Sequence, residues 1–334
     1  MINVIVIAVV WFGAKQVDLG TLQVGNMMAF IQYSMQIMFS FLMLSMVFVL
    51  LPRASVSAKR ISDVLSVTPV INDPEEPKFP SKQRGLVEFK NVGFIYPDCD
   101  APVLYDINFI AKPNQVTAII GSTGSGKSTI VNLIPRFYDV TKGSIEVDGI
   151  NIKDYNQNDL RKKIGYVPQK GVLFSGTIES NLKYGKNATE EELVKATKIA
   201  QAYDFIMDKE DKFDNEIAQG GSNVSGGQRQ RLAIARAIVK EPEIFIFDDS
   251  FSALDFKTDS ELRHALKENI KDATVIIVAQ RISTIMNADQ IIVLDEGKMV
   301  GIGTHKELLK KCKIYKEIAS SQLSKEELAW RKIK

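Results

Sequence analysis

The residues whose types and spacing most clearly indicate a chemical function lie in one glycine-rich run in the first half of the chain. Positions 121 to 128 read GSTGSGKS, between the apolar run VTAII and a second apolar segment. Glycines in such a run let the backbone turn tightly, so that its N–H groups can point inward at phosphate oxygens. A helix that begins near Lys127 directs the positive end of its dipole to the same place. The run therefore predicts a phosphate-binding loop.

The side chains of this loop predict what it binds. Lys127 would reach the β and γ phosphates of a nucleotide, and the Ser128 hydroxyl would be a Mg²⁺ ligand. A glycine-rich turn without a ligand is disfavoured by the strand pattern before the loop and the helix pattern after it. The predicted phosphate-contacting residues are Gly121, Ser122, Thr123, Gly124, Ser125, Gly126, Lys127, Ser128 and Thr129.

A second carboxylate-bearing strand follows at 243 to 250, with the sequence EIFIFDDS. Its four apolar residues predict a buried strand that delivers Asp248 to its carboxyl edge. Asp248 would hold the Mg²⁺ shell. The alternative is that the acidic pair Asp248 and Asp249 merely forms an exposed turn, which the upstream phosphate loop disfavours.

Between these two motifs, Ser225-Gly226-Gly227-Gln228 opens a strongly helical segment. A helix N-terminus capped by serine and opened by two glycines can approach a phosphate closely. The order of phosphate loop, SGGQ, DD and then SALD at 252 to 255 resembles the nucleotide-binding domain of an ATP-binding cassette (ABC) transporter. In that family SGGQ contacts the γ-phosphate of ATP held by the other subunit, so the resemblance implies a head-to-tail dimer.

Three further positions match the family's pattern. Tyr96 in VGFIYP resembles the aromatic residue on which adenine stacks. Gln169 in YVPQ resembles the glutamine that touches Mg²⁺ and the attacking water and senses the membrane domain. Asp255 ends a segment similar to the loop that crosses between subunits. The resemblance thus implies ATP and Mg²⁺ as cofactors, with Ser128, Gln169 and Asp248 around the metal.

Two departures from the family's pattern fall at catalytic positions. The family places glutamate after the Mg²⁺ aspartate, whereas this chain has Asp249, and it usually has a histidine where VIIVAQRIST at 275 to 284 gives Gln280. A carboxylate retracted by about 1 Å can cost on the order of 100-fold in rate, and an amide cannot carry a proton or a positive charge. Together with IAQGGSN at 217 to 223, these changes favour a degenerate subunit of a heterodimeric exporter. A fully active homodimer is the alternative.

The hydropathy is distributed unevenly, because no charged residue occurs between Asp18 and Arg53. Residues 22 to 51 exceed the ~20 apolar residues that a membrane-spanning helix needs. Basic residues follow Pro52, which puts the carboxyl end of this helix in the cytoplasm. Three polar residues share one helix face: Gln32, Gln36 and Ser40. These side chains either pack against neighbouring helices or line a polar cavity.

The first stretch, MINVIVIAVVWF, is too short to cross a membrane alone. It lacks the basic region and the cleavage site of a signal peptide. It is interpreted as the later part of a penultimate helix whose beginning precedes Met1, so that Met1 is an internal start or a boundary of the sequence. The resemblance implies six membrane helices before the ATPase of an exporter, of which the last and half of its predecessor are here.

Four regions follow from the pattern along the chain. Residues 1–65 are the end of a transmembrane domain with a cytoplasmic helical extension, and 66–85 are a linker because prolines cluster there. Residues 86–325 form the nucleotide-binding domain, and 326–334 form a tail. Strands are predicted at 86–92, 115–120, 163–168, 243–248, 273–278 and 290–294, helices at 127–135, 189–202, 225–239 and 255–268, and antiparallel hairpins around 143–149 and 296–303.

The resemblance implies a fold class: an α/β P-loop NTPase domain with added antiparallel β and helical subdomains, fused to an α-helical transmembrane fragment. The expected function is the ATP-binding and ATP-hydrolysing subunit of an exporter of drug, lipid or peptide across the plasma membrane, as a multi-pass protein with its ATP-binding domain in the cytoplasm. Its expected partners are a second half-transporter, membrane lipid and the exported substrate. A membrane-anchored regulatory module is the rival hypothesis.

Composition adds two exclusions. The 42 Lys and Arg residues nearly balance the 40 Asp and Glu residues, so that no nucleic-acid partner is indicated. A soluble ATPase acting on nucleic acid is also disfavoured by the apolar segment at 22 to 51. The isolated cysteines, Cys99 and Cys312, lack metal-ligand spacing and fit reduced thiols.

Overall fold

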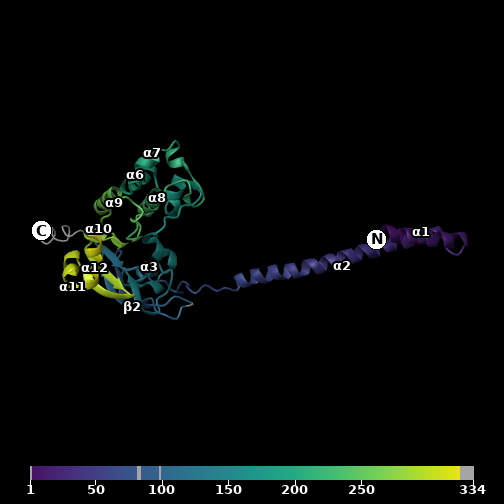
Figure 1. Cartoon of the computed structure of the whole chain (residues 1–334), viewed down its shortest axis with the longest axis horizontal. Helices are drawn as coiled ribbons and strands as arrows, with labels where there is room; N and C mark the ends of the chain where they lie inside the picture. Colours follow the sequence, from purple (N-terminus) through teal and green to yellow (C-terminus); the bar gives the residue numbers. More distant parts are fainter. Residues whose placement is uncertain (1, 81–83, 98, 324–334) are drawn as a thin grey trace. The chain divides into compact units, whose positions relative to one another are not determined.

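A computed structural model describes residues 2–80, 84–97 and 99–323, and the chain divides into two compact units at Val70 and Ile71 (Figure 1). The first unit is helical and the second holds the predicted nucleotide-binding domain, called the cassette below. The predicted tail at 326–334 lies outside the described residues. The predicted domain boundaries at 65 and 85 therefore stay predictions, although the cassette unit already begins at Ile71.

The helical unit consists of α1 (Ile2–Asp18) and α2 (Val24–Leu65), which pack together next to the turn that joins them. The contact is close at Gly13, where an added Cβ would lie 2.9 Å from Met27 Cγ. Among the described residues, α2 is the one helix long and apolar enough to cross a membrane. It begins at Val24 and continues through Pro52, and Ser40 Oγ donates to the carbonyl oxygen of Gln36 in its own helix (2.9 Å).

The cassette is built on a ten-stranded mixed sheet with the order β5-β4-β1-β2-β12-β11-β3-β10-β9-β6. Its parallel part carries the chemistry: β3 (Val116–Gly121), β6 (Ile164–Val167), β9 (Ile244–Asp248), β10 (Thr274–Val278) and β11 (Gln290–Asp295). Antiparallel pairs join β1 (Val87–Phe94) to β2 (Leu104–Ala111) and β4 (Lys142–Val147), β4 to β5 (Ile150–Asn151), and β12 (Lys298–Gly303) to β11, while β12 and β2 pair in parallel. A separate hairpin pairs β7 (Gly176–Thr177) with β8 (Glu216–Ile217).

Alternation along the central strand creates two cores. Ala118 and Ile120 of β3 belong to one cluster of buried residues, while Ile119 between them belongs to the other. Successive strand residues point to opposite faces of a sheet, so β3 is buried on both. The first cluster packs the helices α6 and α8 against the sheet, and the second packs α3 and the antiparallel strands.

The helices of the cassette fall into two groups in space. Figure 1 shows α6, α7 and α8 gathered at one end of the unit, with α11 and α12 at the other. The first group is the helical subdomain that the fold class predicted. The helices are α3 (Lys127–Leu133), α4 (Gln157–Lys162), α5 (Ile178–Leu182), α6 (Glu190–Ile199), α7 (Tyr203–Met207), α8 (Gly226–Val239), α9 (Phe256–Asn269), α10 (Ile282–Ile285), α11 (His305–Lys311) and α12 (Lys313–Gln322).

The fold confirms the predicted class and each predicted strand and helix of the cassette to within a few residues. Several short elements were not predicted from the sequence, namely β7, β8, α4, α5, α7, α10 and α11, and two longer elements also differ from the prediction. The strand β2 was not predicted, because its buried and exposed residues do not alternate regularly around Asp106, which has a positive φ of 48°. The C-terminal helix α12 was not predicted either.

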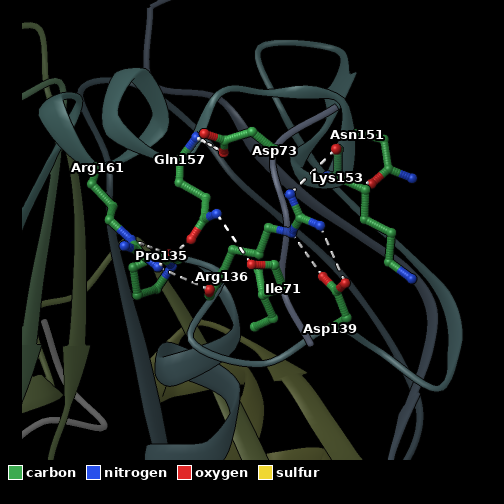
Figure 2. Close-up of polar contacts among 9 residues, drawn as sticks. All are labelled: Ile71, Asp73, Pro135, Arg136, Asp139, Asn151, Lys153, Gln157 and Arg161. Carbon is green, nitrogen blue, oxygen red and sulfur yellow. Dashed lines mark hydrogen bonds and ion pairs between the residues drawn. The ribbon is translucent and has the colours of Figure 1, made fainter. Parts of the chain in front are cut away.

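Part of the proline-rich linker is bound to the cassette surface (Figure 2). Asp73 accepts hydrogen bonds from the backbone N–H of Gln157 (2.8 Å) and from Asn156 Nδ2 (2.9 Å), at the N-terminus of α4. The Gln157 amide donates to the carbonyl oxygen of Ile71 (3.4 Å) and accepts from Arg161 Nη2 (3.1 Å). The linker is therefore held to the cassette by defined contacts at Ile71 and Asp73.

From Arg161 the contacts continue to the end of the phosphate-loop helix. Arg161 Nε donates to the carbonyl oxygen of Pro135 (3.2 Å) and its Nη2 to that of Arg136 (3.3 Å). Arg136 is buried and pairs with Asp139 (2.8 Å) (Figure 2). A continuous set of polar contacts thus joins Asp73 to the segment that follows α3.

The replacement Asp73→Ala is expected to lower the thermal midpoint of the cassette by about 2–4 °C. The carboxylate caps a helix N-terminus, and losing such a cap costs about 1 kcal/mol. Thermal unfolding of the full chain in detergent measures the shift. Lys78→Ala is the matched control in the same linker, because its ion pair with Asp154 is exposed and such pairs contribute ~0.5 kcal/mol or less. Equal midpoints for the two variants would contradict the capping role.

Candidate functional site

The phosphate loop lies between the end of β3 and the start of α3. Gly124 and Gly126 have positive φ angles of 81° and 94°, a conformation that favours glycine. At Gly121 an added Cβ would lie 2.1 Å from the carbonyl oxygen of Leu294 on β11. The glycines at these three positions are therefore required by backbone geometry, and the tight loop that they permit is the one predicted from the sequence.

Lys127 is the buried charge of the loop. Its Nζ donates to the carbonyl oxygens of Gly121 (2.9 Å) and Ser122 (2.7 Å), so the ammonium group is held inside the curve of the loop. Burial lowers the pKa of Lys127, and the negative charges of Asp249 and Asp248 oppose that shift. A cation in this position is suited to binding phosphate oxygens.

The side chains that would hold Mg²⁺ meet at the carboxyl edge of the sheet. Ser128 Oγ donates to Asp248 Oδ1 (3.0 Å), which pairs a hydroxyl with a carboxylate as Mg²⁺ sites do. Within the described ranges no group of three or more His, Cys, Asp or Glu side chains could hold a metal ion. Mg²⁺ at nucleotide sites needs only one or two carboxylates, because phosphates complete its shell. The residues therefore fit Mg²⁺ bound together with a nucleotide.

One buried polar atom of the loop supports the same fit. In the part of the chain that the structure describes, Ser125 Oγ is buried and has no hydrogen-bond partner. Buried hydroxyls are normally satisfied, and leaving one unsatisfied costs about 1–3 kcal/mol. The atom sits in the same loop as the inward-facing Lys127 ammonium, so an anionic ligand of the loop would satisfy it.

Asp249 follows Asp248, the predicted Mg²⁺ carboxylate, and accepts hydrogen bonds from both of the predicted catalytic amides. Gln280 Nε2 donates to Asp249 Oδ2 (2.9 Å), and Gln169 Nε2 donates to the same oxygen (3.2 Å). Asp249 has a positive φ of 47°, a conformation in which aspartate is tolerated better than most residues. The structure therefore brings together all three residues of the catalytic prediction, which are 80 and 31 positions apart.

Burial dominates the ionisation of the two carboxylates. It raises the pKa of Asp249, while hydrogen bonds from Gln169 and Ser252 and the charges of Lys127 and Arg281 lower it in part. Burial also raises the pKa of Asp248, against the hydrogen bond from Ser128. Both groups thus hold a proton more readily than exposed aspartates, and a cation beside them would favour their charged forms.

Tyr96 packs beside the loop helix. Its hydroxyl is 3.0 Å from Thr129 Oγ1, and its ring makes edge contacts with Phe94 (4.7 Å between centroids) and Tyr138 (5.1 Å). The ring is half-buried, which leaves part of its surface open. The position is compatible with the predicted stacking of adenine, which stays a prediction.

Tyr166 of β6 is a neighbour of the site that the sequence analysis missed. Its hydroxyl donates to Asn132 Oδ1 (2.8 Å) and lies 3.5 Å from Asp248 Oδ2. Burial raises the pKa of Tyr166, so that it remains a donor. The only sequence signal was its position three residues before Gln169 in YVPQ.

The signature residues form a separate helix terminus. Ser225 caps α8 in a reciprocal pair, accepting from the Gln228 N–H (3.2 Å) while its own N–H donates to Gln228 Oε1 (3.1 Å). An added Cβ at Gly226 would meet nothing within 4 Å. The helix start is therefore capped as predicted and open to an approaching group. These residues bond to one another and to α8, and the structure does not bring them to the phosphate loop.

Asp255 has a local role in the structure. It caps α9, accepting from the Thr258 N–H (3.0 Å) and from Thr258 Oγ1 (2.7 Å). These hydrogen bonds lower the pKa of its carboxyl group. Two residues before it in the chain lie near the signature helix: an added Cβ at Gly227 would be 3.4 Å from the carbonyl oxygen of Ala253 and 3.9 Å from Leu254 Cδ2.

Comparison with known proteins agrees with this geometry. Residues 104–252 match the ABC transporter family. An uncharacterized ABC transporter ATP-binding protein of Mycobacterium bovis is 49% identical over 326 residues, which cover 96% of this chain and 56% of that protein. An ATP-binding/permease protein of Staphylococcus aureus, with a provisional assignment to multidrug export, is 46% identical over 241 residues, which cover 72% of this chain and 42% of that protein.

A solved structure extends the similarity beyond the cassette. A bacterial Atm1-family ABC exporter with ATP bound has a TM-score of 0.84 and 33% sequence identity, covering 97% of this chain and 57% of that one. The matched regions thus cover between 42% and 57% of the length of these three proteins. It belongs to the ABC transporter family, with the ATP-binding domain and an adjoining helical segment of an exporter half-transporter.

Proposed function

We propose that the chain is one half of a heterodimeric ABC exporter and that its own ATP site hydrolyses slowly. The observation that carries the proposal is the position of Asp249, whose Oδ2 atom accepts both the Gln280 and the Gln169 amides. Both amides therefore occupy the oxygen that would accept a proton from an attacking water. The aspartate side chain is also shorter than glutamate, so it reaches less far toward an attacking water.

The contacts support the following proposed roles for the residues of this site. The phosphate loop and Lys127 bind the ATP phosphates, Tyr96 supports the adenine, and Ser128, Gln169 and Asp248 surround Mg²⁺. The metal neutralises charge on the phosphates when it is bound. Gln280 contacts the γ-phosphate as a hydrogen-bond donor without a positive charge, since a carboxamide does not titrate.

The signature is proposed to serve the partner's site. Ser225 to Gln228 present an open, capped helix N-terminus to ATP held by the second half-transporter, and Asp255 lies at the boundary between the subunits. ATP binding closes the two domains, and hydrolysis with product release opens them. The transported substrate is a drug, lipid or peptide, and the helix α2 lies in the plasma membrane as part of a multi-pass domain in contact with lipid.

The purified pair tests the proposal directly. Asp249→Asn is expected to lower total ATP turnover by less than about twofold, because this site contributes little to it. Replacing the glutamate at the corresponding position of the partner by glutamine is expected to lower turnover by about 100-fold or more. Steady-state ATPase assays on each variant measure both values. Equal losses from the two replacements would mean that both sites are catalytically active.

A further inference from the structure

The loop that carries Gln280 is held by a side chain from the C-terminal helix. Gln322, in the last turn of α12, donates from Nε2 to the carbonyl oxygen of Gln280 (2.8 Å). Its Oε1 accepts the N–H of Ile282 (2.8 Å). One carboxamide therefore bridges the backbone on both sides of Arg281, between the end of β10 and the start of α10.

The loop that carries Gln169 is held in the same way from another helix. Gln230 of α8 donates from Nε2 to the carbonyl oxygen of Pro168 (3.2 Å), and its Oε1 accepts the N–H of Gly171 (2.9 Å). Each of the two amides that meet on Asp249 is thus carried by a loop whose backbone is bridged by a glutamine. Gln230 is buried, whereas Gln322 is exposed and can be replaced without opening a cavity.

The helix that carries Gln322 is anchored in the core. Tyr315 and Ala319 of α12 are fully buried, and Tyr315 Oη is 2.7 Å from His305 Nδ1. Ile318 and Leu323 pack against the same buried cluster. Gln322 therefore projects from a fixed element and bonds to a short loop whose own side chains, Gln280 and Arg281, are exposed.

Holding this loop fixes two groups relative to Asp249. The Gln280 amide is 2.9 Å from Asp249 Oδ2. The charge of Arg281 is close enough to lower the pKa of Asp249. A loop released from Gln322 would let both groups move, while Ile282 remains buried and the phosphate loop keeps its own contacts.

We propose that Gln322 is a positioning residue for ATP hydrolysis: through the backbone of Gln280 and Ile282 it holds the Gln280 amide on Asp249 and does not itself touch the nucleotide. The C-terminal helix thereby becomes part of the support of the ATP site. The inference rests on the proposed function of Gln280 as the residue that contacts the γ-phosphate.

The test compares Gln322→Ala with Ser321→Ala, its exposed neighbour on α12, whose hydroxyl donates to the carbonyl oxygen of Ile318 in the same helix. Both are made in the full chain, purified with its partner, whose own site is silenced by replacing its glutamate. Loss of one or two hydrogen bonds corresponds to a change of about threefold to tenfold. In Gln322→Ala, hydrogen exchange of the Ile282 N–H is expected to be about threefold to tenfold faster. The single-turnover hydrolysis rate is expected to fall by a similar factor. The Kd for MgATP is expected to change by less than about twofold. Ser321→Ala is expected to change none of these.

A double-mutant cycle with Gln280→Ala separates positioning from a general structural effect. If Gln322 acts through Gln280, adding Gln322→Ala to Gln280→Ala lowers the rate no further. Gln322→Glu keeps the acceptor for Ile282 and loses the donor to Gln280, so it is expected to preserve the slow exchange of Ile282 and to lower the rate.

Four results would contradict the positioning role of Gln322 or the proposed role of Gln280. A rate for Gln322→Ala equal to that of Ser321→Ala, or a full additional loss in the double variant, overturns the inference. A parallel change in Kd, rate and thermal midpoint also overturns it, because that pattern means destabilisation of the domain. If Gln280→Ala alone leaves the rate unchanged, the proposed role of Gln280 fails, which is distinct from a failure confined to Gln322.

Discussion

Replacing Lys127 by alanine is expected to raise the Kd for MgATP by about 100-fold. The ammonium group lies inside the phosphate loop and donates to two loop carbonyl oxygens, so it is positioned to contact phosphate oxygens bound by the loop. Hydrogen bonds to charged groups contribute about 1.5–3 kcal/mol, and the loss of one near the upper end of that range gives the stated change. No other lysine is part of the loop.

Thermal stabilisation by ATP measures this prediction without requiring turnover. A ligand at 100 times its Kd stabilises a protein by about 2.7 kcal/mol, and a Kd raised 100-fold reduces this to about 0.4 kcal/mol. Lys112→Ala is the matched control, because it removes the same charge from an exposed position before β3. A Lys127→Ala variant that keeps the full midpoint shift with MgATP would show that the loop does not bind the phosphates through this amine.

The parts of the site that could be predicted from the sequence are those whose chemistry is local. The phosphate loop contains its glycines, its lysine and its serine within a single run, and Asp248 ends a strand whose apolar residues are contiguous. The SGGQ terminus likewise contains both halves of its capping pair, Ser225 and Gln228. In each case the residues that define the feature are close in sequence, so that a pattern identifies it.

The parts that could not be predicted depend on pairs distant in sequence. Gln322 reaches a carbonyl group 42 positions away, and Asp73 reaches a helix start 84 positions away. Nothing in the sequence around Gln322 or around Asp73 indicates which residues they contact. The same holds for Tyr166, because its approach to Asp248 follows from the parallel pairing of β6 with β9.

The meeting of the amides on Asp249 shows where the two kinds of information combine. The sequence predicted that Gln169, Asp249 and Gln280 belong to one site, because each matched or departed from a family position. The structure adds that both amides use the same oxygen of Asp249 and that Asp249 has a positive φ. The departure from glutamate therefore changes the length of the side chain in a backbone conformation that also favours aspartate.

The double replacement Asp249→Glu with Gln280→His is expected to raise hydrolysis at this chain's own site by about 100-fold. The glutamate carries the carboxylate about 1 Å further, and misplacement on that scale costs on the order of 100-fold. Histidine in place of Gln280 can carry a positive charge, which an amide cannot. Asp249→Glu alone is expected to give a smaller rise, about tenfold, because the amide that remains at position 280 cannot carry the positive charge.

Single-turnover rates in the purified pair, with the partner's site silenced, measure the gain. Asp249→Asn is the matched control: it keeps the shorter length without the charge and is expected to give no rise. The longer side chain in the left-handed conformation at 249 is expected to lower the thermal midpoint by about 2–4 °C, since strain of this kind costs about 1 kcal/mol. If the parent chain and the double variant are equally slow, side-chain length and charge at these two positions do not limit the site. If both hydrolyse ATP at a high rate, the slow-site proposal itself is contradicted.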